Sequence, residues 1–402
     1  MHIIFHQKKK PEGESGFGPL EEWGHEILFV QEPLAALRAL KENSPCLLLL
    51  GDDALPSESL KILRGLEELR ENGTSAYATL LTSPEQKLDL EAAYEAGLDD
   101  YLSATPGEGE LRLRLHAASR ILDLRSDHAE SRRILEKANR RIRAELEAAA
   151  RIQASLLPQN PRTYSELDFA WRFLPSHELA GDILNIFSLD ESHIALYVLD
   201  VSGHGIRAAL HAVSMSRLLA PLLDQGSLLK VRDESSPRKY RLTSPAEVAR
   251  TLNQRFPMDP ENLQYFTMLY GILNLKTGEF TYVPCANPGF VRVSPDGEME
   301  LLENPGYPIG LEETADFEEF TIQLKKGERL YIYTDGIPEA ENPQEEYFSQ
   351  EQVLRTLEKH EKVELEASLD AIVNTVHEWC GTNKFKDDIT LLGLEYRGPN
   401  AP

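Results

Sequence analysis

The hydrophobic and polar positions of this chain follow three different patterns along its length. Up to about Arg120, short apolar runs alternate with longer stretches in which apolar residues recur every three or four positions. Such runs are typical of buried strands, and such stretches of amphipathic helices. The runs are "HIIF", "EILFV", "CLLLL" and "AYATLL", and the stretches are "PLAALRALKE", "SLKILRGLEELREN" and "DLEAAYEAG". Because strands alternate with helices, residues 1–120 are expected to form a parallel sheet that is covered on both faces.

The second pattern covers residues 111–157, which contain neither glycine nor proline; the next proline is Pro158. Apolar residues recur there at spacings of three, four or seven, as they do in a coiled coil about three heptads long. Glu145 interrupts one core position of this stripe. The stripe consists of Leu135, Ala138, Ile142, Ala149, Ile152 and Leu156. We expect a helical linker at 121–158 that pairs with a second copy of the chain as a homodimer; a long solvated helix lying on a domain is the alternative.

The third pattern, over residues 159–402, consists of many short runs of β-branched and aromatic residues, such as "HIALYVLD", "FTMLYGILNL" and "ERLYIYTDG". Turn signals such as "KTGE", "PDGE" and "KKGE" separate them. Helical patterns are few and grouped, which favours an α+β sandwich. The polar segment 223–245 is expected to be a mobile insertion.

Composition narrows the classes of function. The formal net charge of −24 makes a nucleic-acid backbone an unsuitable partner. The three scattered cysteines form neither a disulfide framework nor a zinc pattern, which indicates a reducing compartment. No apolar stretch is long enough to span a bilayer, and the N-terminus lacks the features of a signal peptide. We therefore expect a cytoplasmic protein without a membrane partner.

Four segments of the third region place aspartate at a strand end or a tight turn. They contain Asp182 in "LAGDILN", Asp200 in "LDVSGHG", Asp335 in "YIYTDG", and Asp387 with Asp388 in "KFKDDITLL". Each segment taken alone has a simple structural explanation. The Asp-Gly pair at 335–336 is a common hairpin turn, and the other aspartates could equally occupy turns.

Taken together, the aspartates indicate a metal site. Asp200 and Asp335 each end an apolar run, and no lysine or arginine lies within three residues of either. A carboxylate beside a hydrophobic core needs a counter-charge. Carboxylate oxygens favour Mg²⁺ or Mn²⁺, and two such ions that share a carboxylate can activate a water for attack on phosphorus.

The segments "AGDILN", "DVSGHGIRAAL", "YTDGIPEAEN" and "DDITLL", in this order and spacing, resemble the PPM-type protein phosphatases. The nearest branch is that of the bacterial stage II sporulation protein E, which includes phosphatases that regulate stress sigma factors. The resemblance covers essentially all of 160–397. It implies an αββα sandwich, a centre of two Mn²⁺ or Mg²⁺ ions between the sheets, and hydrolysis of phosphoserine or phosphothreonine on a protein.

The resemblance also assigns roles to residues. It implies metal ligands at Asp182, Asp200 (bridging), the carbonyl of Val201, Asp335 and Asp387, with Asp388 as the weaker candidate of its pair. The aspartates at 182, 200, 335 and 387 would thereby form the catalytic set. His204 is expected to shape the turn into the following helix. Many family members have a second aspartate three residues after the first, and here that position is Asn185.

Residues 1–120 resemble a response-regulator receiver. "CLLLLGDDALP" resembles its third strand, with Asp52 where the phosphoacceptor would be and Thr82 where a switch hydroxyl belongs. However, His6 and Gln7 replace the acidic pair after the first strand, and Thr105 replaces the lysine. We expect a pseudo-receiver that senses by protein contact. Phosphorylation of Asp52 and a plain turn role for this residue are the alternatives.

The patterns together predict a metal-dependent serine/threonine phosphatase. By resemblance, its substrate would be a phosphorylated anti-sigma-factor antagonist, and the N-terminal domain would control it through the linker helix. A non-catalytic PPM-fold module that sequesters a signalling partner is the alternative. A phosphorelay output driven through Asp52 is a third reading.

Overall fold

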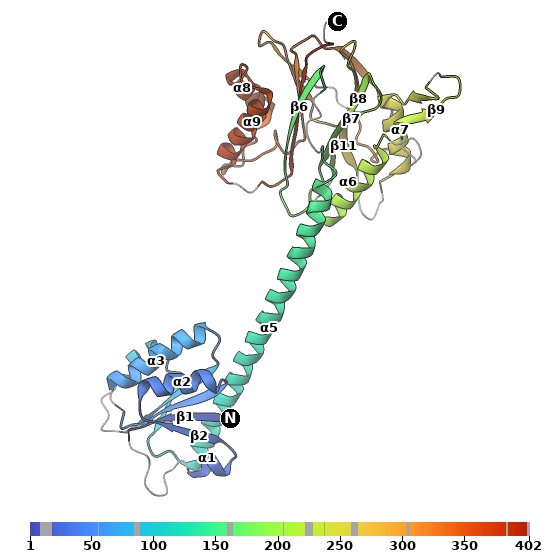
Figure 1. The fold of residues 1–402 in the computed structure, drawn as a ribbon. Helices are drawn as coiled ribbons and strands as arrows, with labels where there is room; N and C mark the ends of the chain where they lie inside the picture. Colours follow the sequence, from blue (N-terminus) through green and yellow to red (C-terminus); the bar gives the residue numbers. More distant parts are fainter. Residues whose placement is uncertain are drawn as a thin grey trace. The chain divides into compact units, whose positions relative to one another are not determined.

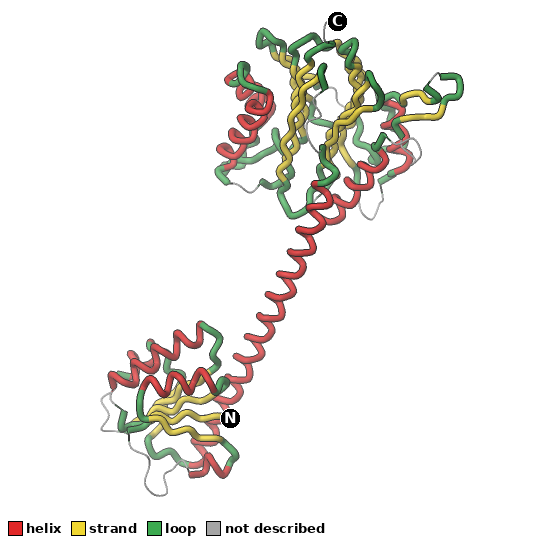
Figure 2. The backbone as a smooth tube through the Cα atoms, in the orientation of Figure 1, coloured by secondary structure: helices red, strands yellow, loops and turns green. Residues whose placement is uncertain are grey.

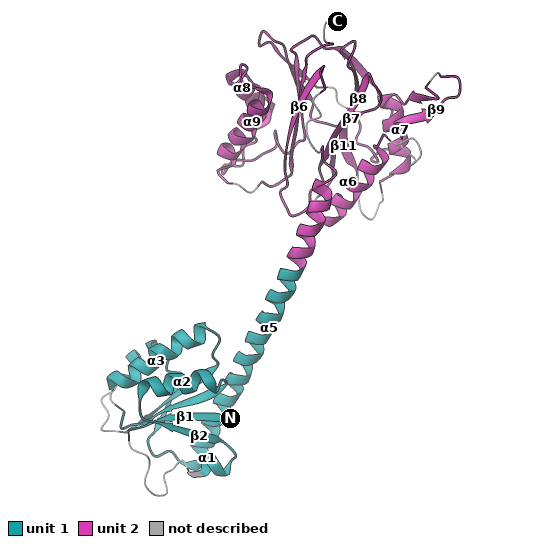
Figure 3. Ribbon diagram, viewed as in Figure 1, with its two compact units in different colours: residues 1–141 teal, residues 142–402 magenta. Residues whose placement is uncertain are grey.

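The computed structural model describes residues 1–8, 18–54, 56–83, 89–158, 164–203, 205–221, 228–236, 238–258, 264–303, 306–382 and 385–399. It forms two compact units, Met1–Arg141 and Ile142–Pro402 (Figure 3). The division falls inside one helix, α5, which runs over Glu108–Ala154. Each unit has hydrophobic clusters of its own.

The N-terminal unit contains a five-stranded parallel sheet in the order β2-β1-β3-β4-β5 (Figure 1). This order and the helices between the strands give a doubly wound α/β fold, as the sequence pattern predicts, and the fold fits the resemblance to a receiver. The described strands are β1 His2–His6, β2 Glu26–Val30, β3 Cys46–Leu50, β4 Ala76–Thr82 and β5 Asp100–Ser103. The described helices are α1 Gly18–Glu22, α2 Pro33–Glu42, α3 Pro56–Glu71 and α4 Leu90–Glu95.

Strand β3 shows why this sheet needs helices on both faces. All five of its residues are buried. Leu48 and Leu50 pack into one cluster with residues of α2 and α3. Leu47 and Leu49 point to the other face, where Leu111 and other residues at the start of α5 cover them. A continuous apolar run is therefore the expected sequence of this central strand.

Helix α5 changes character along its length. Its first turns pack on the sheet through Leu111, Leu115, Ala118 and Leu122. Beyond them the apolar stripe is uncovered, and the residues from Ser131 to Glu145 are all exposed. The helix has the length expected from a stretch without glycine or proline. No helix among the described residues is both long and apolar enough to cross a membrane.

The C-terminal unit contains two antiparallel sheets that face each other (Figure 2). One has the order β15-β12-β11-β8-β7 and the other β14-β13-β16-β17-β6. The first sheet consists of β7 Ile183–Ser188, β8 His193–Val201, β11 Phe266–Asn274, β12 Glu279–Cys285 and β15 Phe320–Gln323. The second consists of β6 Leu167–Leu174, β13 Phe290–Val293, β14 Met299–Leu302, β16 Arg329–Tyr333 and β17 Ile389–Tyr396.

Helices cover the outer face of each sheet, which makes the unit an αββα sandwich (Figure 1). The helices are α6 Ile206–Leu218 and α7 Pro245–Arg255 on the first sheet, and α8 Ser349–Lys359 and α9 Leu365–Cys380 on the second. Strand β16 shows the layering: Leu330 and Ile332 join the core between the sheets, while Tyr331 and Tyr333 pack in the cluster that contains α9. The predicted α+β sandwich is confirmed.

One sequence expectation needs correction. Segment 223–245 was expected to be a mobile insertion, but its described part contains a hairpin of β9 Lys230–Arg232 and β10 Tyr240–Leu242. The hairpin is anchored because Leu228 and Leu229, just before it, are buried in the main core. An ion pair between Arg238 and Asp190 also holds it. The polar composition concealed these anchors.

Candidate metal centre

The four aspartate segments of the C-terminal unit meet at one end of the sandwich. Asp182 immediately precedes β7, and Asp200 lies near the end of the neighbouring antiparallel strand β8. Asp335 follows β16, and Asp387 precedes β17, which pairs with β16 in the other sheet. Antiparallel pairing brings the end of one strand beside the start of its neighbour. Each sheet therefore contributes two of the aspartates.

Two glycines allow the segments to approach closely. A Cβ atom at Gly336 would lie 1.9 Å from the carbonyl oxygen of Asp388, a distance that no side chain can occupy. A Cβ atom at Gly181 would lie 2.9 Å from the carbonyl oxygen of Val201. Glycine at these positions lets the backbones pass in contact. The Val201 carbonyl consequently lies beside the residue that precedes Asp182.

Asp182 is held inside the protein, with only 1% of its surface exposed. The Thr334 hydroxyl donates a hydrogen bond of 2.9 Å to its Oδ2, and the Thr390 amide donates one of 3.1 Å to the Thr334 hydroxyl. Burial, and then the neighbouring charges of Asp200 and Asp388, raise the pKa of Asp182 well above its usual value. The bonds from threonine favour the ionised form but do not cancel this effect.

Asp200 and Asp335 share this electrostatic environment. Burial raises the pKa of Asp200 to about 8, with further contributions from the charges of Asp335 and Asp387. Burial, followed by the charges of Asp387 and Glu339, raises the pKa of Asp335 to about 6. The carboxylates therefore repel one another in the absence of a cation. A bound divalent ion would remove the cause of this repulsion.

The donor set fits hard divalent ions. It consists of carboxylate oxygens and a backbone carbonyl, which are ligands that Mg²⁺ and Mn²⁺ prefer. Within the described ranges, no three histidine, cysteine, aspartate or glutamate side chains already enclose a position for a metal. The described side chains do not by themselves form a closed metal shell. The fit to Mg²⁺ or Mn²⁺ therefore rests on the type of the donor atoms.

The two consecutive aspartates before β17 lie in different surroundings. Asp387 is exposed and, together with Gly336, lines a cavity. Asp388 is buried, and its Oδ1 accepts hydrogen bonds from the Ser176 amide at 2.7 Å and the Ser176 hydroxyl at 2.9 Å. Its Oδ2 accepts one from the Gly181 amide at 2.7 Å. Both carboxylate oxygens of Asp388 thus fasten the loop that leads to Asp182.

The end of α5 reaches the same loop. The Gln153 side chain is almost fully buried and donates a hydrogen bond of 2.7 Å to the Ala180 carbonyl. It accepts another of 3.1 Å from the Ala180 amide. Asn185 donates a bond of 3.0 Å to the Leu156 carbonyl, just after the helix. Asn185, which stands where many family members have an aspartate, therefore ties the start of β7 to the helix end.

Sequence reasoning singled out the aspartates as candidate ligands, and it did not include the residues that bond to them and to their loops. Thr334 and Thr390 each lie within two residues of a predicted ligand and interrupt apolar runs, which is the signal that could have revealed them. Gln153 could have been noticed as a polar residue close to the apolar Leu156 and Leu157. His204 lies outside the described residues. Its neighbours Gly203 and Gly205 have φ values of 88° and 83°, as a sharp turn into α6 requires.

The predicted phosphoacceptor lies in the N-terminal unit. Asp52 is half-buried in the turn after β3, at the end of the strand that pairs with β1. His6, at the end of β1, is fully buried. Lys8 forms an ion pair of 3.4 Å with Glu58 and donates its amide to Asp53. The Thr82 hydroxyl donates to the Leu102 carbonyl at 3.2 Å.

A family model agrees with the arrangement of the C-terminal unit. The model described as Stage II sporulation protein E (SpoIIE) matches residues 190–397, more than half of the chain. The chain belongs to the SpoIIE family. The matched span contains Asp200, Asp335, Asp387 and Asp388, while Asp182 precedes it. The resemblance stated from the sequence motifs is thereby confirmed.

Two curated proteins of Bacillus subtilis (strain 168) are similar to this SpoIIE chain. The phosphoserine phosphatase RsbP is 30% identical over 193 residues, which are 48% of this chain and 45% of RsbP. The phosphoserine phosphatase RsbU is 28% identical over 199 residues, which are 49% of this chain and 54% of RsbU. The chain thus spans about half the length of the curated relatives that it matches.

A solved structure supports the fold of the SpoIIE region. The SiaA-PP2C domain of Pseudomonas aeruginosa superimposes with a TM-score of 0.53 at 20% sequence identity. The match covers 64% of this chain and 98% of that domain. It confirms the αββα architecture that the motifs imply.

Proposed function

We propose that this SpoIIE-family protein is a metal-dependent phosphatase that hydrolyses phosphoserine or phosphothreonine on a protein partner. The observation that carries the proposal is the meeting of four aspartate segments from two sheets, whose buried or half-buried carboxylates repel one another. The names of RsbP and RsbU as phosphoserine phosphatases support the same chemistry. By the resemblance of the motifs to the stage II sporulation protein E branch, we propose that the substrate is a phosphorylated partner of the anti-sigma-factor antagonist type.

Two Mn²⁺ or Mg²⁺ ions, when bound, would supply Lewis-acid stabilisation of the phosphoryl group and an activated water. The residues that would hold them are Asp182, Asp200, the Val201 carbonyl, Asp335 and Asp387. Asp388 has both oxygens engaged with the loop at 176–181, so we assign it to positioning. Thr334 orients the carboxylate of Asp182 through its hydroxyl. Burial keeps bulk water away from Asp182 and strengthens its interaction with a cation.

The proposal is tested by hydrolysis of p-nitrophenyl phosphate in the full-length protein. The assay compares Mn²⁺, Mg²⁺ and EDTA for wild type, Asp200→Asn and the exposed control Asp296→Asn. Turnover that needs the metal and is lost only in Asp200→Asn supports the phosphatase. Absence of turnover in the wild type, together with no Mn²⁺ binding by calorimetry, would refute it.

That negative result would favour a second function, a non-catalytic PPM-fold module that sequesters a signalling partner. Two observations favour this alternative: Asn185 replaces an acidic residue, and the described carboxylates do not enclose a metal position. The retained aspartates weigh against it, since a scaffold has no need for four carboxylates whose mutual repulsion is destabilising. The metal-dependent assay separates the two functions.

We further propose that residues 1–120 regulate a catalytic domain at 159–402 through the linker at 121–158. Gln153 supports this idea because it joins the end of α5 to the backbone directly before Asp182. A shift of this helix end would therefore change the position of a proposed ligand. The uncovered apolar stripe of α5 supports pairing with a second copy, since Leu135, Ile142 and Ile152 are 61%, 55% and 66% exposed.

The input reaches the N-terminal domain by protein contact in this proposal. His6 and Gln7 occupy the positions at which a receiver would hold Mg²⁺ with acidic residues. Phosphorylation of Asp52 is the alternative. Incubation with acetyl phosphate followed by mass measurement separates the two, with Asp52→Asn as the control, and a gain of one phosphoryl group in the wild type alone would establish the phosphorelay.

A further inference from the structure

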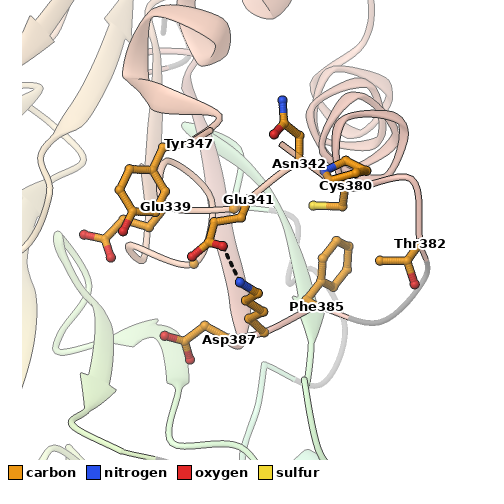
Figure 4. Close-up of a pocket in the computed structure, with 12 residues that line it drawn as sticks. Glu339, Glu341, Asn342, Tyr347, Cys380, Thr382, Phe385 and Asp387 are labelled. Atoms are coloured by element: carbon orange, nitrogen blue, oxygen red, sulfur yellow. Dashed lines mark hydrogen bonds and ion pairs between the residues drawn. The ribbon is translucent and has the colours of Figure 1, made fainter. Parts of the chain in front are cut away.

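A cavity of about 360 Å³ opens directly beside the candidate metal centre. Its wall is formed by the loop after β16, the end of α9 and the turn before β17 (Figure 4). Gly336 and Asp387 both line it, and Gly336 follows the proposed ligand Asp335. One end of the cavity is therefore formed by the proposed metal ligand Asp387. A group bound in the cavity would lie next to a phosphoryl group held at the centre.

Aromatic side chains form two walls of this cavity. Tyr347 comes from the loop and is 59% exposed, and Phe385 comes from the turn before β17 (Figure 4). The Phe385 ring packs against His377 with ring centres 4.4 Å apart. The indole of Trp379, in α9, donates a hydrogen bond of 3.2 Å to the carbonyl of Glu346, the residue before Tyr347. Both walls are thus supported by the same helix.

The rim of the cavity is acidic. Glu339, Glu341 and Asp387 contribute carboxylates, and Lys386 contributes the one ammonium group among the described lining residues. Glu341 and Lys386 form an ion pair with each other. Glu339 is exposed, and its charge acts on Asp335. With metal ions neutralising Asp387, the rim still carries a net negative charge at Glu339.

We propose that this cavity receives a lysine or arginine side chain next to the phosphoserine of the protein substrate. Such a side chain has an aliphatic stem that packs on aromatic rings and a cationic head that is attracted to both ring faces and carboxylates. An acidic neighbour would be repelled by the rim, and a small neighbour would leave the aromatic walls uncovered. The inference rests on the proposed phosphatase function and adds a specificity determinant to it.

The experiment measures kcat/KM of the full-length protein for short phosphoserine peptides. The peptides carry lysine, alanine, leucine or glutamate at one position, one or two residues before or after the phosphoserine. Lysine is expected to exceed alanine by about two- to five-fold at positions on one side only, because exposed cation–aromatic contacts have this strength. Glutamate is expected to fall below alanine.

Four variants test the residues that the proposal names. Tyr347→Ala should bring the lysine-to-alanine ratio close to one, whereas Tyr347→Phe should keep it, since the ring and not the hydroxyl makes the contact. Variants at the two partners of the Glu341–Lys386 ion pair change the charge of the cavity in opposite directions. Glu341→Gln should lower the ratio, and Lys386→Gln should raise it, each by about two-fold, the range of an exposed ion pair. Ratios cancel any general change in activity.

The outcomes separate this inference from the proposed function. No metal-dependent hydrolysis of p-nitrophenyl phosphate would mean that the phosphatase function itself is wrong. Hydrolysis of that small substrate, with equal rates for the lysine and alanine peptides, would overturn only the inference. A preference for leucine, or equal shifts in Glu341→Gln and Lys386→Gln, would overturn it as well.

Discussion

The Thr334 hydroxyl joins three strands of the C-terminal unit. It donates to Asp182 before β7 and accepts from the Thr390 amide in β17, while Thr334 itself follows β16. One hydroxyl thereby connects the two sheets at the proposed metal centre. A buried hydroxyl with both its donor and its acceptor in use is costly to replace by an apolar group.

Thr334→Val should destabilise the protein by about 1–3 kcal/mol, because the buried Asp182 loses the hydrogen bond from Thr334 and the Thr390 amide loses its acceptor. Mn²⁺ binding should weaken with it. Chemical denaturation and calorimetry measure the two effects, and Thr334→Ser, which keeps the hydroxyl, is the control. Equal stability and metal affinity in Thr334→Val would show that this hydroxyl does not position Asp182.

Asp200 illustrates the opposite situation, a side chain whose charge is unfavourable without a cation. In EDTA, Asp200→Asn should raise the free energy of unfolding by on the order of 1–2 kcal/mol, because it removes a buried charge that other carboxylates repel. Added Mn²⁺ should stabilise the wild type and leave the variant unchanged. Thermal unfolding with and without Mn²⁺ measures both effects, and a variant less stable than wild type in EDTA would contradict the repulsion.

At the scale of elements, the end of α5 and the start of β7 act as one assembly. The amide group of Gln153 bonds to both backbone groups of Ala180, and Asn185 bonds back to the segment after the helix. These bonds connect a helix to a loop that otherwise depends on Asp388. The position of the helix end is therefore part of the geometry of the proposed site.

Gln153→Ala in the full-length protein should lower metal-dependent turnover by about ten-fold, since two buried hydrogen bonds to the loop before Asp182 are lost. The main effect should be a higher Mn²⁺ concentration for half-maximal rate. Arg151→Ala, at an exposed neighbouring position, is the matched control. Identical metal titrations for the two variants would remove Gln153 from the proposed control of the site.

The elements themselves could be predicted because burial imposes a period. Strand β3 is a continuous apolar run because both of its faces are covered. The residues of β16 alternate between two hydrophobic clusters because the strand separates two layers. The aspartates could be predicted because their motifs are local in sequence. Gln153, Thr334 and the cavity beside Asp387 could not, since each depends on contacts between segments distant in sequence. The β9–β10 hairpin was missed because two buried leucines outweigh its polar composition.

At the scale of the whole molecule, the middle of α5 carries an apolar stripe that the rest of the described chain leaves exposed. Ile142 lies in the middle of this stripe and is more than half exposed. Burial of the stripe against a second copy would remove this surface from water, at about 25 cal/mol for each Å². The heptad spacing of the stripe is the pattern by which helices of two copies would pair, and it supports the homodimer that we propose.

Ile142→Glu should therefore shift the protein from dimer to monomer, because a charge at a core position is poorly tolerated in a coiled coil. Light scattering coupled to gel filtration measures the mass over a range of concentrations. Arg143→Glu, at the next exposed position, introduces the same charge outside the stripe and should leave the dimer intact. A wild type that stays monomeric at every concentration would exclude this mode of pairing.

The close contact between Gly336 and the backbone of Asp388 limits which residues can occupy position 336. Any side chain at 336 would collide with the backbone of Asp388 and push apart the segments of Asp335 and Asp387. In a library that carries every amino acid at this position, selection for activity should return glycine alone. A related chain could thus keep every carboxylate of the centre and still lose its activity through one methyl group at position 336. The presence of the ligands in a relative does not by itself show that the relative is active.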